Sequence, residues 1–151
     1  MRPKIGIITS KGGHVYQMFR LKPWWIRYEH FWVTLPGEDV ASLLRNENVY
    51  YGYAPETRNI VNAVRHVALA WKLLRNERPT HLISCGAGIA PPFFLVAKIL
   101  GISTIFIEAF DLVKAPSLTG RILSPFVDYL LVQHKRQRRF YPQALYKGAI
   151  L

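Results

Sequence analysis

The sequence contains a single cysteine, Cys85, which lies in an apolar stretch of a chain of 151 residues. One cysteine excludes an internal disulfide framework and is typical of a protein from a reducing compartment. Acidic residues are also scarce: nine Asp and Glu stand against 20 Lys and Arg, which gives a formal net charge of +11. This excess predicts an anionic partner, and charge alone does not choose among nucleic acid, anionic lipid and a phosphorylated substrate.

Long hydrophobic runs are absent. The longest stretch without a charge covers residues 82–97, where Gly86, Gly88, Pro91 and Pro92 interrupt it. A membrane-spanning helix needs roughly 18 or more apolar residues, so we expect no transmembrane helix. The N-terminus has a basic start, but its apolar run is short and leads into glycines, so we expect no signal peptide. Peripheral membrane binding stays open.

Complete nucleotide-binding motifs are absent as well. The stretch "SCGAGIAPP" (84–92) has no third glycine in register and no following Gly-Lys-Ser/Thr, which argues against a dinucleotide enzyme and against an NTPase. His30, His66 and His81 show no metal-ligand spacing with one another or with Cys85. We therefore expect neither a metal site nor a cofactor.

Strand and helix patterns alternate along the chain. Apolar and β-branched runs predict strands at residues 4–9, 30–35, 49–53, 81–85, 103–108 and 129–133. Helical patterns lie between them, at residues 14–21, 36–46, 57–78 and 91–100, and a short basic helix follows the last strand. This order predicts one α/β domain over residues 1–151, with a parallel sheet and helices on both faces.

The clearest helical pattern is the one over residues 57–78. Its apolar residues fall on one stripe, opposite a basic side, which is the pattern of a helix packed on a core. The residues of the stripe are Ile60, Val64, Val67, Trp71 and Leu74.

The stretch "SKGGHVYQM" follows the first predicted strand. Gly12 and Gly13 allow a tight turn and expose N–H groups at a helix N-terminus, next to Ser10, a geometry that suits a phosphate or diphosphate. His14 would lie in the first helical turn, where an imidazole can take a proton from a hydroxyl near neutral pH. In the alternative interpretation the glycines only make the turn and His14 caps the helix.

In a parallel sheet, ligands bind beyond the carboxyl ends of the strands. Three short stretches are expected there: 10–14, 86–88 and 108–111. Gly86 and Gly88 of the second stretch are therefore further candidates for binding a diphosphate. Glu108 ends an apolar strand, where a carboxylate is costly to bury unpaired. It either binds a substrate hydroxyl or pairs with an arginine or a backbone N–H.

Taken together and in order, several stretches resemble the accessory subunits of split glycosyltransferases. This group includes the membrane-anchoring subunit of the eukaryotic UDP-GlcNAc transferase that acts on dolichol-linked oligosaccharide. It also includes bacterial polysaccharide-biosynthesis proteins of the PssD and CpsF type, which we expect to be nearer because the sequence lacks an N-terminal membrane helix. The stretches are "KGGHVYQM", "RNIVNAVRHVALAWKLLRNERPTHLISCGAGIAPPFFLVAKILG", "IFIEAFD", "SLTGRILSPFVDYLLVQ" and "YPQALYKGAIL".

The resemblance implies a Rossmann-like fold equivalent to the N-terminal half of a GT-B glycosyltransferase. It further implies a subunit that binds a polyprenyl-diphosphate saccharide and docks peripherally at the cytoplasmic face of a membrane. A separate small protein would bind the UDP-sugar, so hexosyl transfer is expected only from the heterodimer. The pathways implied are capsule, exopolysaccharide or lipid-linked oligosaccharide synthesis.

The resemblance also suggests roles for particular residues. "GGH" is similar to the glycine-rich loop of single-chain relatives such as the MurG transferase, which makes His14 the leading catalytic candidate. Glu108 is the second candidate, as a ligand of an acceptor hydroxyl. Ser117, Thr119 and Gly120 would line the same crevice, and a helix cap is the alternative for them.

Two stretches could face a membrane. Trp24 and Trp25 lie among basic residues, a mixture found at membrane interfaces and also in single-stranded nucleic-acid binders. The stretch "HKRQRRF" adds four cations that attract anionic lipid, although a solvated helix face is the plainer interpretation. These cations are Lys135, Arg136, Arg138 and Arg139.

Two other classes of function stay open. A basic nucleic-acid-binding module would explain the charge and the aromatic residues, but no RRM, KH or helix-turn-helix pattern is present, so we expect no nucleic-acid partner. An independent nucleotide-binding Rossmann protein is the other alternative. Its fingerprint glycines are incomplete, and no acidic residue ends the second predicted strand, where Leu35 and Pro36 stand.

Overall fold

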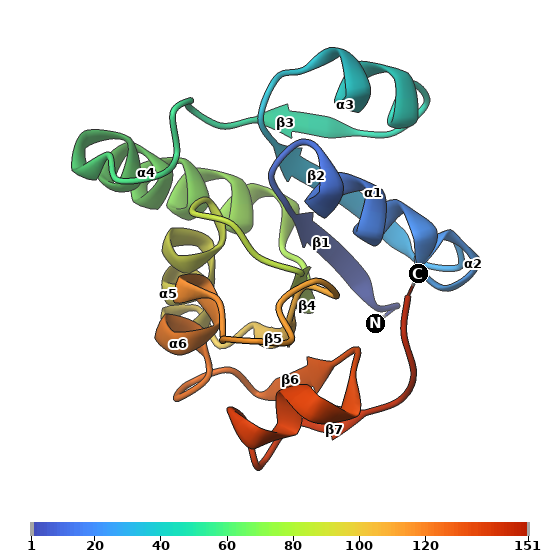
Figure 1. Ribbon diagram of the computed structural model, residues 1–151. Helices are drawn as coiled ribbons and strands as arrows, with labels where there is room; N and C mark the ends of the chain where they lie inside the picture. Colours follow the sequence, from blue (N-terminus) through green and yellow to red (C-terminus); the bar gives the residue numbers. More distant parts are fainter. Residues whose placement is uncertain (1, 151) are drawn as a thin grey trace.

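The computed structural model describes residues 2–150 (Figure 1). Its core is a seven-stranded, entirely parallel sheet with the strand order β3-β2-β1-β4-β5-β6-β7. The strands are β1 (Lys4–Ile8), β2 (Glu29–Thr34), β3 (Val49–Tyr51), β4 (His81–Ser84), β5 (Ser103–Ile107), β6 (Tyr129–Val132) and β7 (Leu145–Tyr146). The predicted Rossmann-like α/β fold is confirmed. The order reverses between β1 and β4, so loops after these strands meet at a topological switch point.

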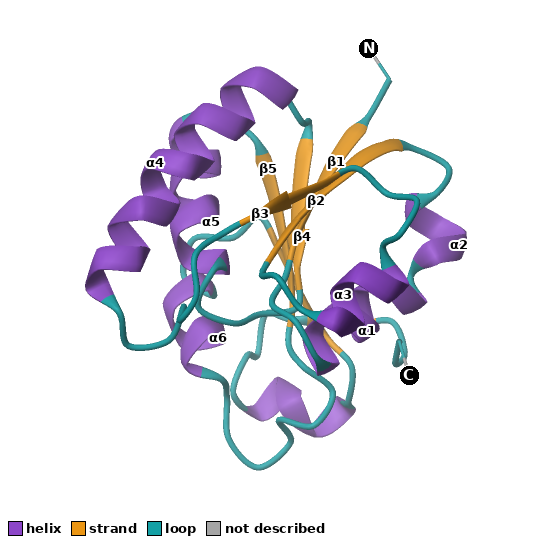
Figure 2. Ribbon diagram, turned by 90° about the horizontal axis from the view of Figure 1, so that it is seen from above, coloured by secondary structure: helices purple, strands orange, loops and turns teal. Residues whose placement is uncertain are grey.

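Helices cover the sheet from both sides (Figure 2). They are α1 (Gly13–Arg20), α2 (Lys22–Trp25), α3 (Glu38–Leu43), α4 (Ile60–Glu77), α5 (Ala90–Ile99) and α6 (Leu118–Leu123), and a 3₁₀ helix, η1 (Lys135–Arg139), follows β6. Helices α4, α5 and α6 lie on one face, and α1, α2 and α3 lie on the other (Figure 2).

Each central strand is buried on both faces because its side chains alternate between two apolar clusters. Ile8 of β1 and Phe31 of β2 pack in the cluster on the side of α4 and α5. Ile7 and Trp32, one residue away on the same strands, pack in the cluster with α1 and α2. This double burial explains why the strands appear in the sequence as nearly continuous apolar runs.

Helix α4 was predicted correctly as a helix, but its predicted core-facing stripe is wrong. Ile60 is 82% exposed, Val64 63% and Trp71 42%, and of that stripe Leu74 is buried. The buried side instead carries Asn62, His66, Ala70, Leu73 and Leu74.

Two polar contacts explain which side of α4 faces inward. The Asn62 amide donates to the carbonyl of Pro55 at 2.8 Å, and the backbone N–H of Tyr53 donates to Nε2 of His66, also at 2.8 Å. Both contacts tie the helix to the loop after β3. The side of the helix that satisfies this loop is therefore buried, and the apolar stripe is left at the surface.

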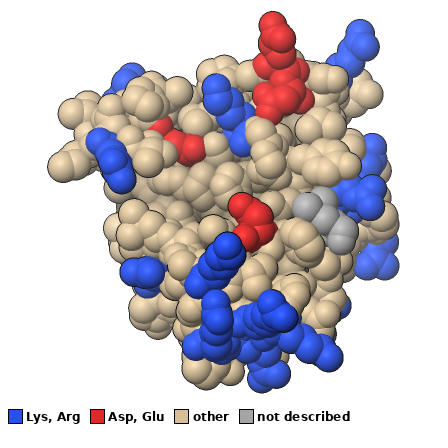
Figure 3. Space-filling model, in the orientation of Figure 1, with Lys and Arg blue, Asp and Glu red and all other residues tan. Residues whose placement is uncertain are grey.

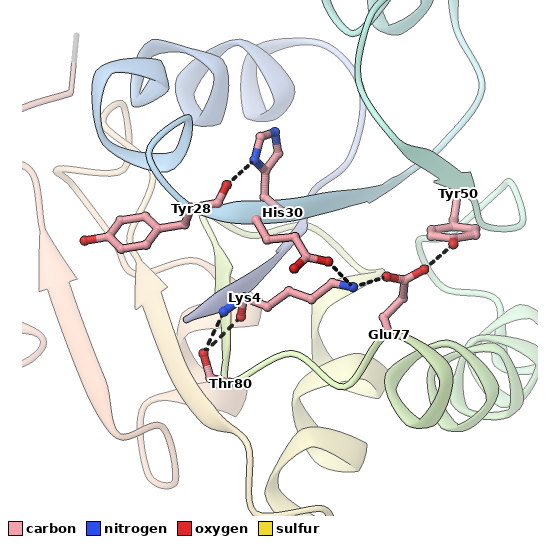
Figure 4. A network of polar contacts seen from close by, with 7 residues as sticks. Lys4, Tyr28, His30, Tyr50, Glu77 and Thr80 are labelled. Carbon is pink, nitrogen blue, oxygen red and sulfur yellow. Dashed lines mark hydrogen bonds and ion pairs between the residues drawn. The ribbon is translucent and has the colours of Figure 1, made fainter. Parts of the chain in front are cut away.

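A polar network fastens the amino ends of the strands (Figure 4). The Lys4 ammonium group lies 2.7 Å from Glu77 of α4 and 2.9 Å from Glu29 of β2. Tyr50 of β3 donates to the same Glu77 carboxylate, and Thr80 bonds the backbone of Lys4. This network lies away from the glycine-rich turns, and it holds β1, β2, β3 and α4 together.

Three elements were not predicted: α2, α6 and the edge strand β7. They have four, six and two residues, which leaves little periodic pattern to recognise; α3 is as short as α6, but Glu38 and Asp39 mark its start. The strand over 129–133 was predicted as the last central one, and β7 pairs beside it. Between residues 2 and 150, no helix is both long enough and apolar enough to cross a bilayer.

Candidate functional site

The first glycine-rich turn joins β1 to α1. Gly12 is the N-cap of the helix, with φ +74°, a conformation that glycine adopts without a steric penalty. Its N–H donates to Oδ2 of Asp39 at 2.6 Å. The N–H groups of Gly13 and His14 lie in the first turn of α1, where no intrahelical acceptor exists for them. A side chain added at Gly13 would meet nothing within 4 Å, so the turn is open to an incoming group.

His14 joins the two glycine-rich turns. A Cβ atom added to Gly86 would lie 3.4 Å from Cε1 of His14, so the imidazole packs directly beside the second turn. Nδ1 of His14 is 3.7 Å from the Cys85 thiol, and this thiol donates to the His14 carbonyl at 3.2 Å. Burial raises the pKa of Cys85 to about 12, which keeps the thiol protonated. His14 is half-buried, and its imidazole lies between the two turns.

The second glycine-rich turn holds a carboxylate of the same chain. Glu56, from the loop after β3, accepts from the Ser10 hydroxyl at 2.5 Å and from the backbone N–H of Ile89 at 3.1 Å. Gly88 is required there because an added Cβ would lie 2.7 Å from the Glu56 carbonyl oxygen. Ser10 and Gly88, predicted to bind a diphosphate, are thus already engaged with Glu56.

Glu108 has a structural role that fits the second of the two interpretations left open by the sequence. Its side chain is fully buried. It accepts from the N–H of Ala109 and of Ser117, both at 3.1 Å, and from the Tyr141 hydroxyl at 2.5 Å. Burial, followed by this contact, raises the pKa of Tyr141. The prediction that Glu108 binds an acceptor hydroxyl is wrong, because a fully buried carboxylate with three internal donors cannot meet an incoming ligand.

Ser117, Thr119 and Gly120 follow their alternative interpretation as well. Ser117 caps α6, since its hydroxyl accepts from the N–H of Gly120 at 2.8 Å. Thr119 and Gly120 are buried, and a Cβ at Gly120 would lie 2.6 Å from Oε2 of Glu108. Ser117 and Gly120 therefore lie against Glu108, and Thr119 is buried in the same short helix.

The predicted membrane-facing tryptophans separate in the structure. Trp25 is fully buried and its indole N–H donates to the Met18 carbonyl at 3.0 Å, so the prediction that it faces a membrane is wrong. Trp24 is half-buried. The basic residues of η1 are exposed: Lys135, Arg136, Arg138 and Arg139. Figure 3 shows that Lys and Arg side chains gather at the lower edge of the molecule.

The sequence did not reveal the two carboxylates that occupy the turns. Asp39 looked like an ordinary acid at a helix start, and Glu56 lies in an irregular loop. They reach partners 27 and 33 to 46 positions away, so no local pattern marks them. Among residues 2–150, no cluster of three His, Cys, Asp or Glu side chains could hold a metal ion.

Solved structures with the same architecture define the class of fold. MurG of Acinetobacter baumannii superimposes with a TM-score of 0.78 at 17% identity, over 97% of this chain and 45% of that one. A UDP-N-acetylglucosamine 2-epimerase from Rickettsia bellii gives 0.79 at 12% identity, over 99% and 46%. The fold is that of the N-terminal Rossmann-like domain of GT-B glycosyltransferases.

A comparison with protein families identifies this chain more specifically than its fold does. Residues 34–150 match the family described as "Oligosaccharide biosynthesis protein Alg14 like", and this chain belongs to it. The human UDP-N-acetylglucosamine transferase subunit ALG14 is 29% identical over 89 residues, which are 55% of this chain and 41% of that protein. The Schizosaccharomyces pombe subunit of the same name is 42% identical over 57 residues, 36% of this chain and 27% of that protein. The chain thus spans less than half the length of these relatives.

Proposed function

We propose that this protein is the acceptor-binding subunit of a two-component glycosyltransferase. The observation that carries the proposal is the open turn after β1, where free first-turn N–H groups and His14 lie together at the switch point of the sheet. Membership in the Alg14-like family supports a role as a glycosyltransferase accessory subunit. The predicted bacterial subtype and a role in capsule or exopolysaccharide synthesis belong to this proposal.

The acceptor in this proposal is a polyprenyl-diphosphate saccharide. The N–H groups of Gly13 and His14 suit a phosphate oxygen at the start of α1. Gly12 and the second turn contribute fewer donors to the acceptor than the sequence predicted. Asp39 already accepts from the N–H of Gly12, and Glu56 already accepts from the N–H of Ile89 beside the second turn. A diphosphate would therefore meet the first turn, and its saccharide would extend over Gly86.

His14 is proposed to assist the acceptor hydroxyl. Its Nδ1 faces Cys85, and Nε2 has no hydrogen-bond partner among residues 2–150, so Nε2 is available to take a proton. The neighbouring thiol does not compete for that role, because its pKa of about 12 keeps it neutral. Proton transfer of this kind contributes about a hundredfold or more in characterised enzymes.

The donor would come from a partner protein. A GT-B enzyme needs two Rossmann-like domains, and the described residues supply one sheet that covers 45% of the MurG chain. We propose that a small UDP-sugar-binding subunit supplies the other half and that the heterodimer works peripherally at the cytoplasmic face of a membrane. The basic residues of η1 are a proposed contact with anionic lipid.

Affinity purification from the native membrane fraction tests the proposal. A second protein with a UDP-sugar-binding pattern, recovered at equal stoichiometry, is the expected result, and the purified pair should transfer sugar to a lipid-diphosphate acceptor. Recovery of a monomer from the soluble fraction without such a partner would overturn it. Salt-sensitive binding to oligonucleotides, without binding to vesicles, would favour the nucleic-acid alternative instead.

A further inference from the structure

Helix α1 carries a second polar side chain beside His14. Gln17 follows His14 by three positions, so the two side chains are neighbours on one face of the helix. This face meets the loops at the carboxyl ends of the central strands: His14 contacts Cys85 after β4, and Gln17 contacts Phe110 after β5. Gln17 is only 6% exposed, and a buried amide needs hydrogen-bond partners on both of its ends.

The partners of Gln17 all lie at one end of its amide. Its Oε1 atom accepts from Nε2 of Gln133 at 2.7 Å and from the backbone N–H of Phe110 at 3.3 Å. Because both partners are donors, the oxygen and not the nitrogen must face them. The two N–H groups of Nε2 have no acceptor among residues 2–150.

Gln133 prevents the Gln17 amide from turning over. Gln133 is 2% exposed, and its Nε2 atom also donates to the Glu108 carbonyl at 3.1 Å. Its Oε1 atom accepts from the N–H of Ile150 at 3.0 Å. Reversing the Gln133 amide would set its nitrogen against a donor, so the nitrogen is held toward Gln17. The Gln17 amide is consequently fixed in one orientation.

The Nε2 atom of Gln17 can still be reached from outside. Among residues 2–150, the fully enclosed side-chain polar atoms without a partner belong to Trp32, Thr34 and His66. Nε2 of Gln17 is not among them. It therefore offers two N–H donors on a side chain that is already ordered, so a ligand would gain these hydrogen bonds without immobilising a flexible glutamine.

We propose that Nε2 of Gln17 donates to a hydroxyl oxygen of the acceptor's saccharide, an inference that rests on the proposed function. Strands β1, β4 and β5 are adjacent in this order. A saccharide that extends from the first turn over Gly86 next reaches the loop after β5, where Gln17 meets Phe110. A neutral amide suits a neutral hydroxyl, whereas the first-turn N–H groups suit the diphosphate. Gln17 would thus distinguish a glycosylated lipid from a bare one.

Two ligands test the inference: a short-chain polyprenyl diphosphate, and the same lipid carrying its saccharide. Their dissociation constants are measured by calorimetry on the co-purified pair of subunits, without UDP-sugar. The wild type should bind the glycosylated lipid more tightly. Gln17→Glu keeps an oxygen for Phe110 and Gln133 but replaces both N–H donors, so it should reduce this preference about fivefold. The ratio of the two constants cancels any effect of the new charge on the shared diphosphate.

Two further variants separate donor loss from other effects. Gln17→Met has neither charge nor N–H, so it should reduce the preference by the same factor even though it also lowers the unfolding temperature. Asn76→Asp is the matched control, because it makes the same change from amide to carboxylate on an exposed side chain of α4, next to the amino end of β4. Its preference should equal that of the wild type.

An unchanged preference in both Gln17 variants would overturn the inference and leave the proposed function standing. Equal affinity of the wild type for the two lipids would have the same meaning, because no saccharide contact would exist. Loss of the partner from Gln17→Glu during purification would assign the amide to the subunit interface instead. A wild-type pair that binds neither lipid would overturn the proposed function together with this inference.

Discussion

Two regions at the carboxyl ends of the strands, which the sequence presented as one crevice, differ in how many of their polar groups are already satisfied. Around Glu108, one buried carboxylate accepts from three donors of the same chain. Around His14, the imidazole is half-buried, Gly13 faces open space, and first-turn N–H groups lack helical acceptors. A position at the carboxyl ends of the strands therefore does not by itself identify a ligand site. Polar groups without partners in the chain identify it.

The comparison assigns the two regions different tasks. The Glu108 pocket fixes the loop between β5 and α6, because Ser117 and Tyr141 meet on one carboxylate. The region around His14 keeps donors and a titratable side chain available for another molecule. Removing the Glu108 carboxylate should therefore change stability, and removing the His14 imidazole should change activity.

The largest effect is expected from Glu108→Ala. The change leaves three buried donors without an acceptor, which should lower the free energy of unfolding by about 3–5 kcal/mol. Tyr141→Phe removes one hydroxyl and should cost about 1 kcal/mol. Urea unfolding followed by circular dichroism measures both. Equal and small losses for the two variants would mean that Glu108 is not the centre of this pocket.

The next effect tests how closely the two turns are joined. Gly86 has φ +125°, so Gly86→Ala should cost about 1–2 kcal/mol in backbone strain and displace the His14 ring. Gly13→Ala is the control: nothing lies within 4 Å of its added methyl group, and alanine favours the helix. Thermal unfolding should show a loss at residue 86 and none at residue 13. A tolerated Gly86→Ala would argue against close packing of His14 on the second turn.

His14→Ala separates activity from stability. With the partner present, turnover should fall by at least about tenfold, while the unfolding transition and partner binding stay unchanged. The measurement is a transfer assay on the co-purified pair at saturating donor. Unchanged turnover would remove His14 from the proton-transfer role and leave the turn as a binding element.

The smallest effect concerns pH. Burial, and secondarily the charge of Arg65, lowers the pKa of His66 below its ordinary 6.5. The unfolded chain therefore binds this proton more readily than the folded protein, so stability should fall as pH drops below about 6.5. Protonation at Nε2 would also remove the acceptor of the Tyr53 N–H. His66→Gln keeps an acceptor and should flatten this part of the stability curve; a steep curve retained in the variant would contradict the assignment.

The order of the elements was predictable, because strands buried on both faces leave continuous apolar runs and the glycine-rich turns punctuate them. The orientation of α4 was not predictable. An apolar stripe shows that a helix is amphipathic, but it does not show whether the stripe faces the core or another surface. Asn62 and His66 face inward through contacts with Pro55 and Tyr53, which no periodicity encodes.

Within the candidate site, the two turns and His14 were predicted from the sequence, but the carboxylates that bind groups of these turns were not. Glu56 and Asp39 reach the turns from loops that are distant along the chain. The full burial of Glu108 likewise depends on Tyr141, 33 positions away. Contacts between distant loops follow from the packing of the whole sheet, so a single sequence does not reveal them.

The most direct test of the account is sugar transfer measured with this protein alone, with its co-purified UDP-sugar-binding partner alone, and with the two combined. The account predicts transfer to a polyprenyl-diphosphate saccharide from the combination and none from either protein by itself. Transfer by the partner alone at the rate of the pair would contradict the claim that this chain supplies the acceptor half of the enzyme.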